Sequence, residues 1–167
     1  MTARSPALTG LYPGTFDPVT RGHEDLIGRA LTIVETLWVG VASDTTKEPL
    51  FPIEDRVEML REVTAGESRI RVEAFAGLTV DFARRIGAQA ILRGLRAVSD
   101  FEFEFQMALM NKHLAPDIEM LFMAPDSTYS FLSSSLVREV ARLGGDVEAF
   151  VSPVVARRLS DRFAGRQ

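Results

Sequence analysis

The sequence contains no cysteine, and its only two histidines lie far apart in the chain. Without cysteine the chain can form no disulfide, no thiolate nucleophile and no cysteine-based zinc site. Two distant histidines also argue against a histidine-rich metal site. No apolar run approaches the roughly 20 residues that a membrane-spanning helix needs, and the first residues lack the apolar core of a secretion signal. We therefore expect a cytoplasmic protein with no membrane partner.

The chain also lacks an excess of positive charge. Its 19 lysines and arginines are outnumbered by 23 acidic residues, so the net charge is −4. This balance argues against a nucleic-acid-binding protein that relies on a broad basic surface. It is compatible with a local cationic pocket for a small anion, and we expect no nucleic acid among the partners.

Three common sequence motifs of enzymes are missing as well. There is no G-x-x-x-x-G-K-[ST] loop, which excludes a P-loop enzyme, and no G-x-G-x-x-G motif, which weighs against a dinucleotide-dependent oxidoreductase. The G-x-S-x-G motif of a hydrolase nucleophile is also absent.

What the sequence does contain is an alternation of two hydrophobic periodicities. Short apolar runs typical of buried strands recur at 7–12, 36–42, 69–75, 88–92 and 118–124. Helical spacing of apolar residues follows them at 23–34, 52–63, 79–87, 99–114, 133–143 and 152–163. This alternation predicts an α/β fold, a Rossmann-like doubly wound parallel five-stranded sheet with helices on both faces. The length suits a single domain over 1–167, of which 1–6 are expected to be flexible.

The architecture also predicts where a ligand would bind. In a sheet of this kind, ligands lie beyond the carboxyl ends of the strands. The segments to inspect are therefore those that follow the predicted strands, at 13–22, 43–51, 76–79, 93–99 and 125–134.

The first of these segments lies within YPGTFDPVTRGHEDL, residues 12–26. Gly14 permits a tight turn and the close approach of backbone to a ligand, and Thr15 and Phe16 offer amides and a hydroxyl. His23 lies in the first turn of the next helix, where free amides and a partial positive charge suit a phosphate. From spacing alone, His23 could equally be a solvated residue of that turn.

A pair of arginines follows the fourth predicted strand, in LRGLRAVSD. Arg93 and Arg96 lie on either side of Gly94 and could bind phosphates with bidentate geometry. The same two side chains could instead form ion pairs with Asp100 and Glu104. The residues themselves leave both alternatives open.

Two other segments contain candidate phosphate ligands. Three consecutive serines, Ser133 to Ser135, lead into a helix and could supply hydroxyls and amides to an anion, although one serine would suffice as a helix cap. Tyr129 could line an adenine pocket or pack at its rim. Lys47 could bind a phosphate or be a solvated loop lysine. Together these features indicate a polyanionic ligand, handled without a covalent nucleophile.

Three longer blocks of sequence resemble a known family. GTFDPVTRGH resembles the T/H-x-G-H signature of the nucleotidyltransferase superfamily, with Thr20 to His23 as its core. Together with RGLRAVSDFEFEFQMALMNKHL and YSFLSSSLVREVARLGGDV, it resembles the phosphopantetheine adenylyltransferase family over residues of about 8 to 160.

The resemblance implies a reaction and several partners. ATP and 4′-phosphopantetheine would give 3′-dephospho-coenzyme A and pyrophosphate, with magnesium. The family also implies a homohexamer, commonly a dimer of trimers, and feedback inhibition by coenzyme A.

The resemblance further implies roles for individual residues. His23, Lys47 and Arg93 would be catalytic. The acceptor 4′-phosphopantetheine would be bound by Thr15, Lys47, Thr79 and Arg93. ATP would be bound by Thr15, Phe16, His23, Gly94, Leu95, Arg96, Glu104, Tyr129, Ser130, Phe131, Leu132, Ser133, Ser134 and Ser135. No cluster of carboxylates suggests protein ligands for the metal.

Overall fold

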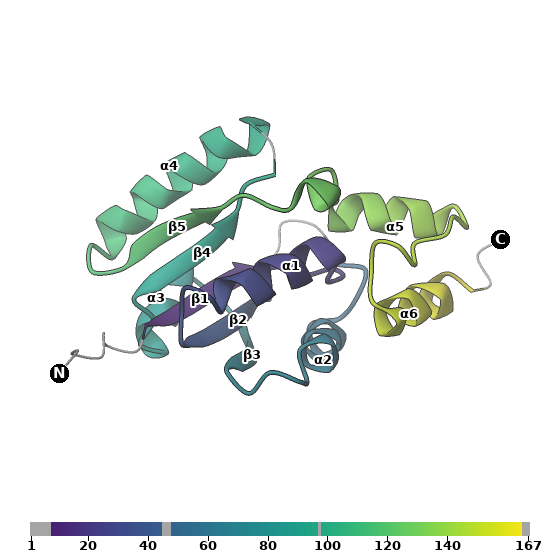
Figure 1. Ribbon diagram of the computed structural model, residues 1–167, viewed down its shortest axis with the longest axis horizontal. Helices are drawn as coiled ribbons and strands as arrows, with labels where there is room; N and C mark the ends of the chain where they lie inside the picture. Colours follow the sequence, from purple (N-terminus) through teal and green to yellow (C-terminus); the bar gives the residue numbers. More distant parts are fainter. Residues whose placement is uncertain (1–7, 45–47, 97, 165–167) are drawn as a thin grey trace.

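A five-stranded parallel sheet forms the centre of the molecule (Figure 1). The computed structural model describes residues 8–44, 48–96 and 98–164. The strands lie in the order β3-β2-β1-β4-β5, and all four neighbouring pairs are parallel. Their bounds are β1 Thr9–Gly14, β2 Thr36–Ala42, β3 Ile70–Phe75, β4 Ala90–Gly94 and β5 Glu119–Met123. The predicted Rossmann-like, doubly wound sheet is therefore confirmed.

Helices cover both faces of this sheet because the strands bury side chains in both directions. One core joins Val39 and Val41 of β2 to α1 (Arg21–Ala30), α2 (Ile53–Val63) and α6 (Pro153–Phe163). A second core, on the other face, joins Leu11 of β1 and Ile91 of β4 to α3 (Thr79–Arg85). The remaining elements are α4 (Val98–Leu114), which lies beside β5, a short 3-10 helix η1 (Ser127–Tyr129) and α5 (Ser134–Arg142) (Figure 1).

Two strands extend further than their apolar patterns predict. Gly14 still pairs with Val41, and Gly94 still pairs with Met123. Backbone pairing does not require an apolar side chain, so the hydrophobic pattern ends before the strand does. As a result, Arg93 lies within β4 instead of in the loop that follows it.

Helices α1 and α2 also differ from their predicted bounds. Helix α1 ends at Ala30, not near Val34, because the amide of Glu35 already donates to the carbonyl of Leu8 at 2.8 Å and leads the chain into β2. Pro52 is the N-cap of α2 and precedes its first turn.

The order of the strands shows that the chain leaves β1 toward one side of the sheet and later returns to its other side. From β1 the chain passes through α1 to β2 on one side, whereas β4 lies on the other side of β1. The carboxyl ends of β1 and β4 therefore flank the position where ligands bind in open sheets of this type.

Candidate active site

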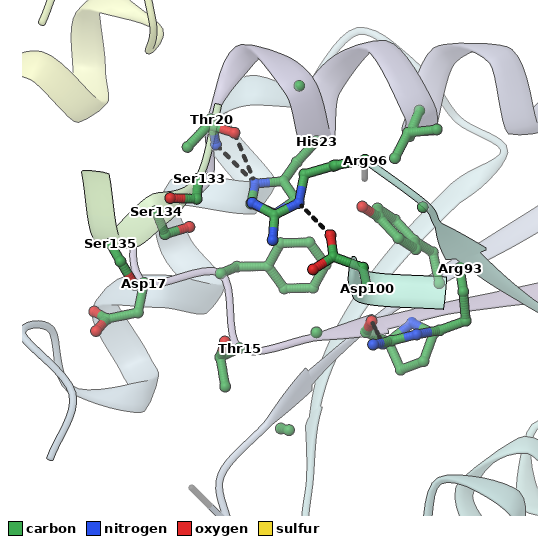
Figure 2. A pocket seen from close by; sticks show the side chains of 18 of the residues that line it. Thr15, Asp17, Thr20, His23, Arg93, Arg96, Asp100, Ser133, Ser134 and Ser135 are labelled. Atoms are coloured by element: carbon green, nitrogen blue, oxygen red, sulfur yellow. Dashed lines mark hydrogen bonds and ion pairs between the residues drawn. The ribbon is translucent and has the colours of Figure 1, made fainter. Parts of the chain in front are cut away.

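A pocket of about 960 Å³ opens at the carboxyl ends of the strands. Its walls come from the ends of β1 and β4, the first turn of α1, the start of α4 and the N-terminus of α5 (Figure 2). The dashed lines in Figure 2 mark the contacts of Thr20 with His23 and of Arg96 with Asp100.

The pocket brings together most of the residues that the sequence singled out. Its lining includes Thr15, Phe16, His23, Thr79, Arg93, Gly94, Arg96, Glu104, Tyr129, Leu132, Ser133, Ser134 and Ser135. Leu95, Ser130 and Phe131 are not among the lining residues, and Lys47 lies outside the described residues, as do 1–6.

Several lining residues were not predicted from the sequence. Asp17 and Arg138 line one side of the pocket, and Phe103 and Met107 line another. Helical spacing could have indicated two of these contacts, since Phe103 and Met107 are four positions apart on α4 and share one face with Glu104. Arg138 lies three residues after Ser135 and so lies on the same side of α5.

His23 is held by the residue that caps its own helix. The backbone amide of Thr20 donates to His23 Nδ1 at 3.0 Å. Because Nδ1 accepts this hydrogen bond, a neutral imidazole must carry its proton on Nε2. Burial, together with the positive charges of Arg96 and Arg93, lowers the pKa of His23 to about 4. The imidazole is therefore a neutral hydrogen-bond donor at physiological pH.

The backbone just before α1 adopts an unusual conformation. Phe16 has a φ of 48°, in the left-handed region that residues other than glycine rarely occupy. Its ring packs edge-on against His23, with the ring centroids 5.0 Å apart. Strained backbone of this kind collects at functional sites, which agrees with the expected contact of the Phe16 backbone with a nucleotide.

A close approach between α1 and β4 brings His23 near the arginine-bearing strand. A Cβ atom on Gly94 would lie 2.5 Å from Cδ1 of Leu26. Glycine at this position therefore lets Leu26 of α1 pack directly on the end of β4.

Arg93 is anchored on three sides. Its Nε and Nη2 donate to the two oxygens of Glu104 at 2.8 and 2.5 Å, and its Nη1 donates to the carbonyl of Pro13 at 2.9 Å. A guanidinium has five N–H donors, so two remain for a ligand. The ion pair that the sequence offered as an alternative to phosphate binding is thus present, and it leaves Arg93 with donors to spare.

The two other arginines of the pocket are paired in the same way. Arg96 lies 3.4 Å from Asp100 and also donates to the carbonyl of Leu132 at 3.0 Å. Arg138 lies 3.1 Å from Asp17. Each of the three pocket arginines therefore has a carboxylate partner.

The three serines differ in how their hydroxyls are used. Ser133 caps α5 and accepts from the amide of Leu136 at 3.1 Å. Ser134 donates to the carbonyl of Pro18 at 2.7 Å, which ties α5 to the loop before α1. Ser135 accepts a long contact of 3.4 Å from Arg138. The N-terminal amides of α5 thus adjoin a pocket that already contains three arginines, a setting that suits an anion.

Comparison with known proteins identifies the class first. The model of the cytidylyltransferase-like family matches residues 11–140. The fold agrees, since the chain superposes on the nicotinic acid mononucleotide adenylyltransferase of Plasmodium falciparum complexed with NaAD with a TM-score of 0.69. That match has 16% identity and covers 92% of this chain and 94% of that chain. The chain is therefore a nucleotidyltransferase.

Sequence relatives narrow this class. The phosphopantetheine adenylyltransferase of Thiobacillus denitrificans is 56% identical over 155 residues, covering 93% of this chain and 97% of the relative. That of Paraburkholderia phymatum is 54% identical over 157 residues, covering 94% of each. The chain belongs to the phosphopantetheine adenylyltransferase family, which confirms the resemblance seen in the sequence.

Proposed function

We propose that this pocket carries out the reaction of its family, the transfer of the adenylyl group of ATP to 4′-phosphopantetheine, by in-line attack without a covalent intermediate. The observation that carries the proposal is the meeting of His23, Arg93 and Arg96 with the N-terminus of α5 at the carboxyl ends of β1 and β4. This arrangement gathers cations and free amides around one position.

The two substrates would occupy different parts of the pocket. ATP is assigned to the side formed by Arg96, the Tyr129–Ser135 segment and His23, which presents its Nε2 donor. The acceptor phosphate is assigned to Arg93, Thr15 and Lys47. Phe103 and Met107 with Thr79 add a partly apolar wall that suits the pantetheine arm.

The chemistry needs positioning more than proton transfer. A phosphate oxygen of 4′-phosphopantetheine is already a nucleophile at neutral pH, and it forms a bond to the α-phosphorus of ATP. The bond from the α-phosphorus to the bridging oxygen breaks, and pyrophosphate leaves. Arg93 orients the attacking phosphate, while His23 and the helix amides stabilise the charge that develops on the α-phosphoryl group.

Magnesium would enter the site bound to ATP, as part of the substrate. Among the residues that the structure describes, no group of three or more histidine or acidic residues could hold a metal ion. The carboxylates of Asp17, Asp100 and Glu104 are each paired with an arginine. Phosphate oxygens and water would therefore provide most of the octahedral shell.

We further propose a homo-oligomer, as expected for the hexameric family. Helix α4 supports this, because large apolar side chains outside the pocket lining remain exposed on it: Phe101, Phe105, Leu109, Met110 and Leu114. A helix that is apolar on several sides is ordinarily buried, and a second copy of the chain would cover it.

Three further proposals follow from the family. They are a single domain over 1–167, a cytoplasmic location and inhibition by coenzyme A. The first is supported by two cores that share one sheet. No helix among the described residues is long and apolar enough to cross a membrane.

A pyrophosphate-release assay tests the proposed reaction. We expect release from ATP plus 4′-phosphopantetheine with magnesium, and none when the acceptor is omitted. Replacing ATP by CTP, and 4′-phosphopantetheine by nicotinic acid mononucleotide, separates this activity from those of other nucleotidyltransferases. Faster release with either replacement would refute the proposed substrates.

A further inference from the structure

A buried carboxylate beside the pocket has no part in the chemistry described above. Asp17 is only 5% exposed and directly follows Phe16 in the loop between β1 and α1. Its Oδ2 accepts from the backbone amide of Leu50 at 2.8 Å, and its Oδ1 accepts from that of Phe51 at 2.9 Å. One carboxylate thus holds two consecutive amides from a segment more than thirty residues away.

A buried arginine holds the same segment through its carbonyls. Arg56 is 2% exposed. Its Nε donates to the carbonyl of Phe51 at 3.1 Å, and its Nη1 donates to those of Ala42 and Thr15 at 3.1 and 2.8 Å. We call Asp17 and Arg56 together the Asp17–Arg56 clamp. The clamp fixes both ends of the connection from β2 to α2 to the loop that carries Thr15.

The clamped connection forms part of the pocket wall. Asp44, Glu48 and Pro49 line the pocket between the two fixed ends. A buried ion pair is in itself weak evidence for stability, because well-packed apolar residues of similar volume often serve as well. Here both oxygens of the carboxylate are used to hold backbone amides in fixed directions, which sets the spacing of two pocket walls.

We propose that Asp17 is a positioning residue for the acceptor substrate. By holding Leu50 and Phe51, it sets the distance between the β2–α2 connection and the Thr15 loop, where the acceptor phosphate must lie in line with the α-phosphorus. The inference rests on the proposed function. Asp17 does not touch a reacting atom, so its effect appears in the binding of one substrate.

Steady-state kinetics of Asp17→Asn test this role. An asparagine keeps the shape of the side chain but turns an NH2 group toward one of the two amides, which opens the clamp. We expect KM for 4′-phosphopantetheine to rise at least tenfold and KM for ATP to change less than threefold. Asp55→Asn, at a half-buried position in the first turn of α2 that pairs with Arg158 outside the pocket, should leave both KM values unchanged.

A second variant tests the other half of the clamp. Arg56→Gln removes the guanidinium that holds the carbonyls of Phe51, Thr15 and Ala42, so KM for 4′-phosphopantetheine should again rise at least tenfold and KM for ATP less than threefold. An equal rise of both KM values in Asp17→Asn, or an unchanged KM for the acceptor in Arg56→Gln, would overturn the inference. A wild-type protein without pyrophosphate release would instead refute the proposed function.

Hydrogen exchange provides a measurement that does not depend on the variants folding. In the wild-type protein, the amides of Leu50 and Phe51 should exchange more slowly when 4′-phosphopantetheine is added than when ATP alone is added. Exchange rates that respond only to ATP would contradict the proposed role.

Discussion

At the scale of single residues, the protonation of His23 defines what the site can do. Its Nδ1 accepts from Thr20, so its Nε2 carries the proton that can point to an oxygen of a phosphate. Burial, together with the neighbouring Arg96 and Arg93, lowers the pKa of the imidazole and keeps it neutral. The positive charge that the site offers to ATP therefore comes from the arginines, and the histidine contributes a directed hydrogen bond.

Loss of this donor should greatly reduce turnover. We expect His23→Ala to lower kcat by more than 100-fold, in line with the roughly 2.7–4 kcal/mol lost when an oxyanion donor is removed. Far-UV circular dichroism should show an intact fold. A purified variant with near-normal turnover would exclude His23 from the proposed role.

The low pKa of His23 also makes stability depend on pH. The folded state holds the imidazole neutral down to a pKa of about 4, whereas the unfolded state protonates it near the ordinary value of 6.5. The unfolded chain therefore binds more protons between these values, and the free energy of unfolding should fall as pH drops from 6.5 to 4.

A variant isolates this contribution from that of the carboxylates. In His23→Gln, urea denaturation should give a smaller loss of stability over the same pH range, while His113 is common to both proteins. Equal pH dependence in the two proteins would mean that His23 is not held neutral.

Arg93 allows the two substrates to be distinguished. Because it is assigned to the acceptor phosphate, Arg93→Ala should weaken binding of 4′-phosphopantetheine at least tenfold more than binding of ATP. Isothermal titration calorimetry measures both affinities. Arg85→Ala removes an exposed arginine that pairs with Glu73 and serves as the control. Similar losses for both ligands would contradict the assignment.

At the scale of elements, α4 combines two faces with different neighbours. Asp100, Phe103, Glu104 and Met107 line the pocket, whereas Phe101, Phe105 and Leu109 are not among the lining residues and form an exposed stripe four residues apart. The rings of Phe101 and Phe105 stack with centroids 5.6 Å apart. A partner that covers the second face would therefore also hold the helix that lines the substrate site.

A charge placed on the exposed stripe should break the proposed assembly. We expect Leu109→Glu to convert much of the protein to smaller species, because a carboxylate would have to be buried where a leucine would contribute about 1.5–3 kcal/mol. Light scattering after size-exclusion chromatography measures the mass. Leu143→Glu, at an exposed leucine outside α4, should not change it.

Strands and their ends are predictable from the sequence. Alternating periodicities predict every strand of the sheet, and the rule for strand ends predicts that His23, Arg93 and Ser133 lie at one edge of it. Side-chain partners at long range are not predictable in this way. That Arg138 meets Asp17, and that Asp17 holds Leu50, depends on how α5 and the β2–α2 connection pack against the first loop.

At the scale of the whole molecule, the strand order explains why distant segments form one site. Placing β4 beside β1 brings residues near positions 15 and 93 to adjacent strand ends. The pocket therefore depends on contacts between parts of the chain that are far apart in sequence. Motifs that are far apart in the sequence form one site only after the sheet has folded.

The pairing of each pocket arginine with a carboxylate has a consequence for salt. A cationic site usually carries ions from solution, and their release on binding makes affinity fall steeply with ionic strength. Here Asp17, Asp100 and Glu104 serve as built-in counter-ions, so the arginines hold few ions from solution for an arriving phosphate to release. The affinity for ATP, which is assigned to Arg96, should therefore depend only weakly on ionic strength, and so should the affinity of Arg93 for the acceptor phosphate.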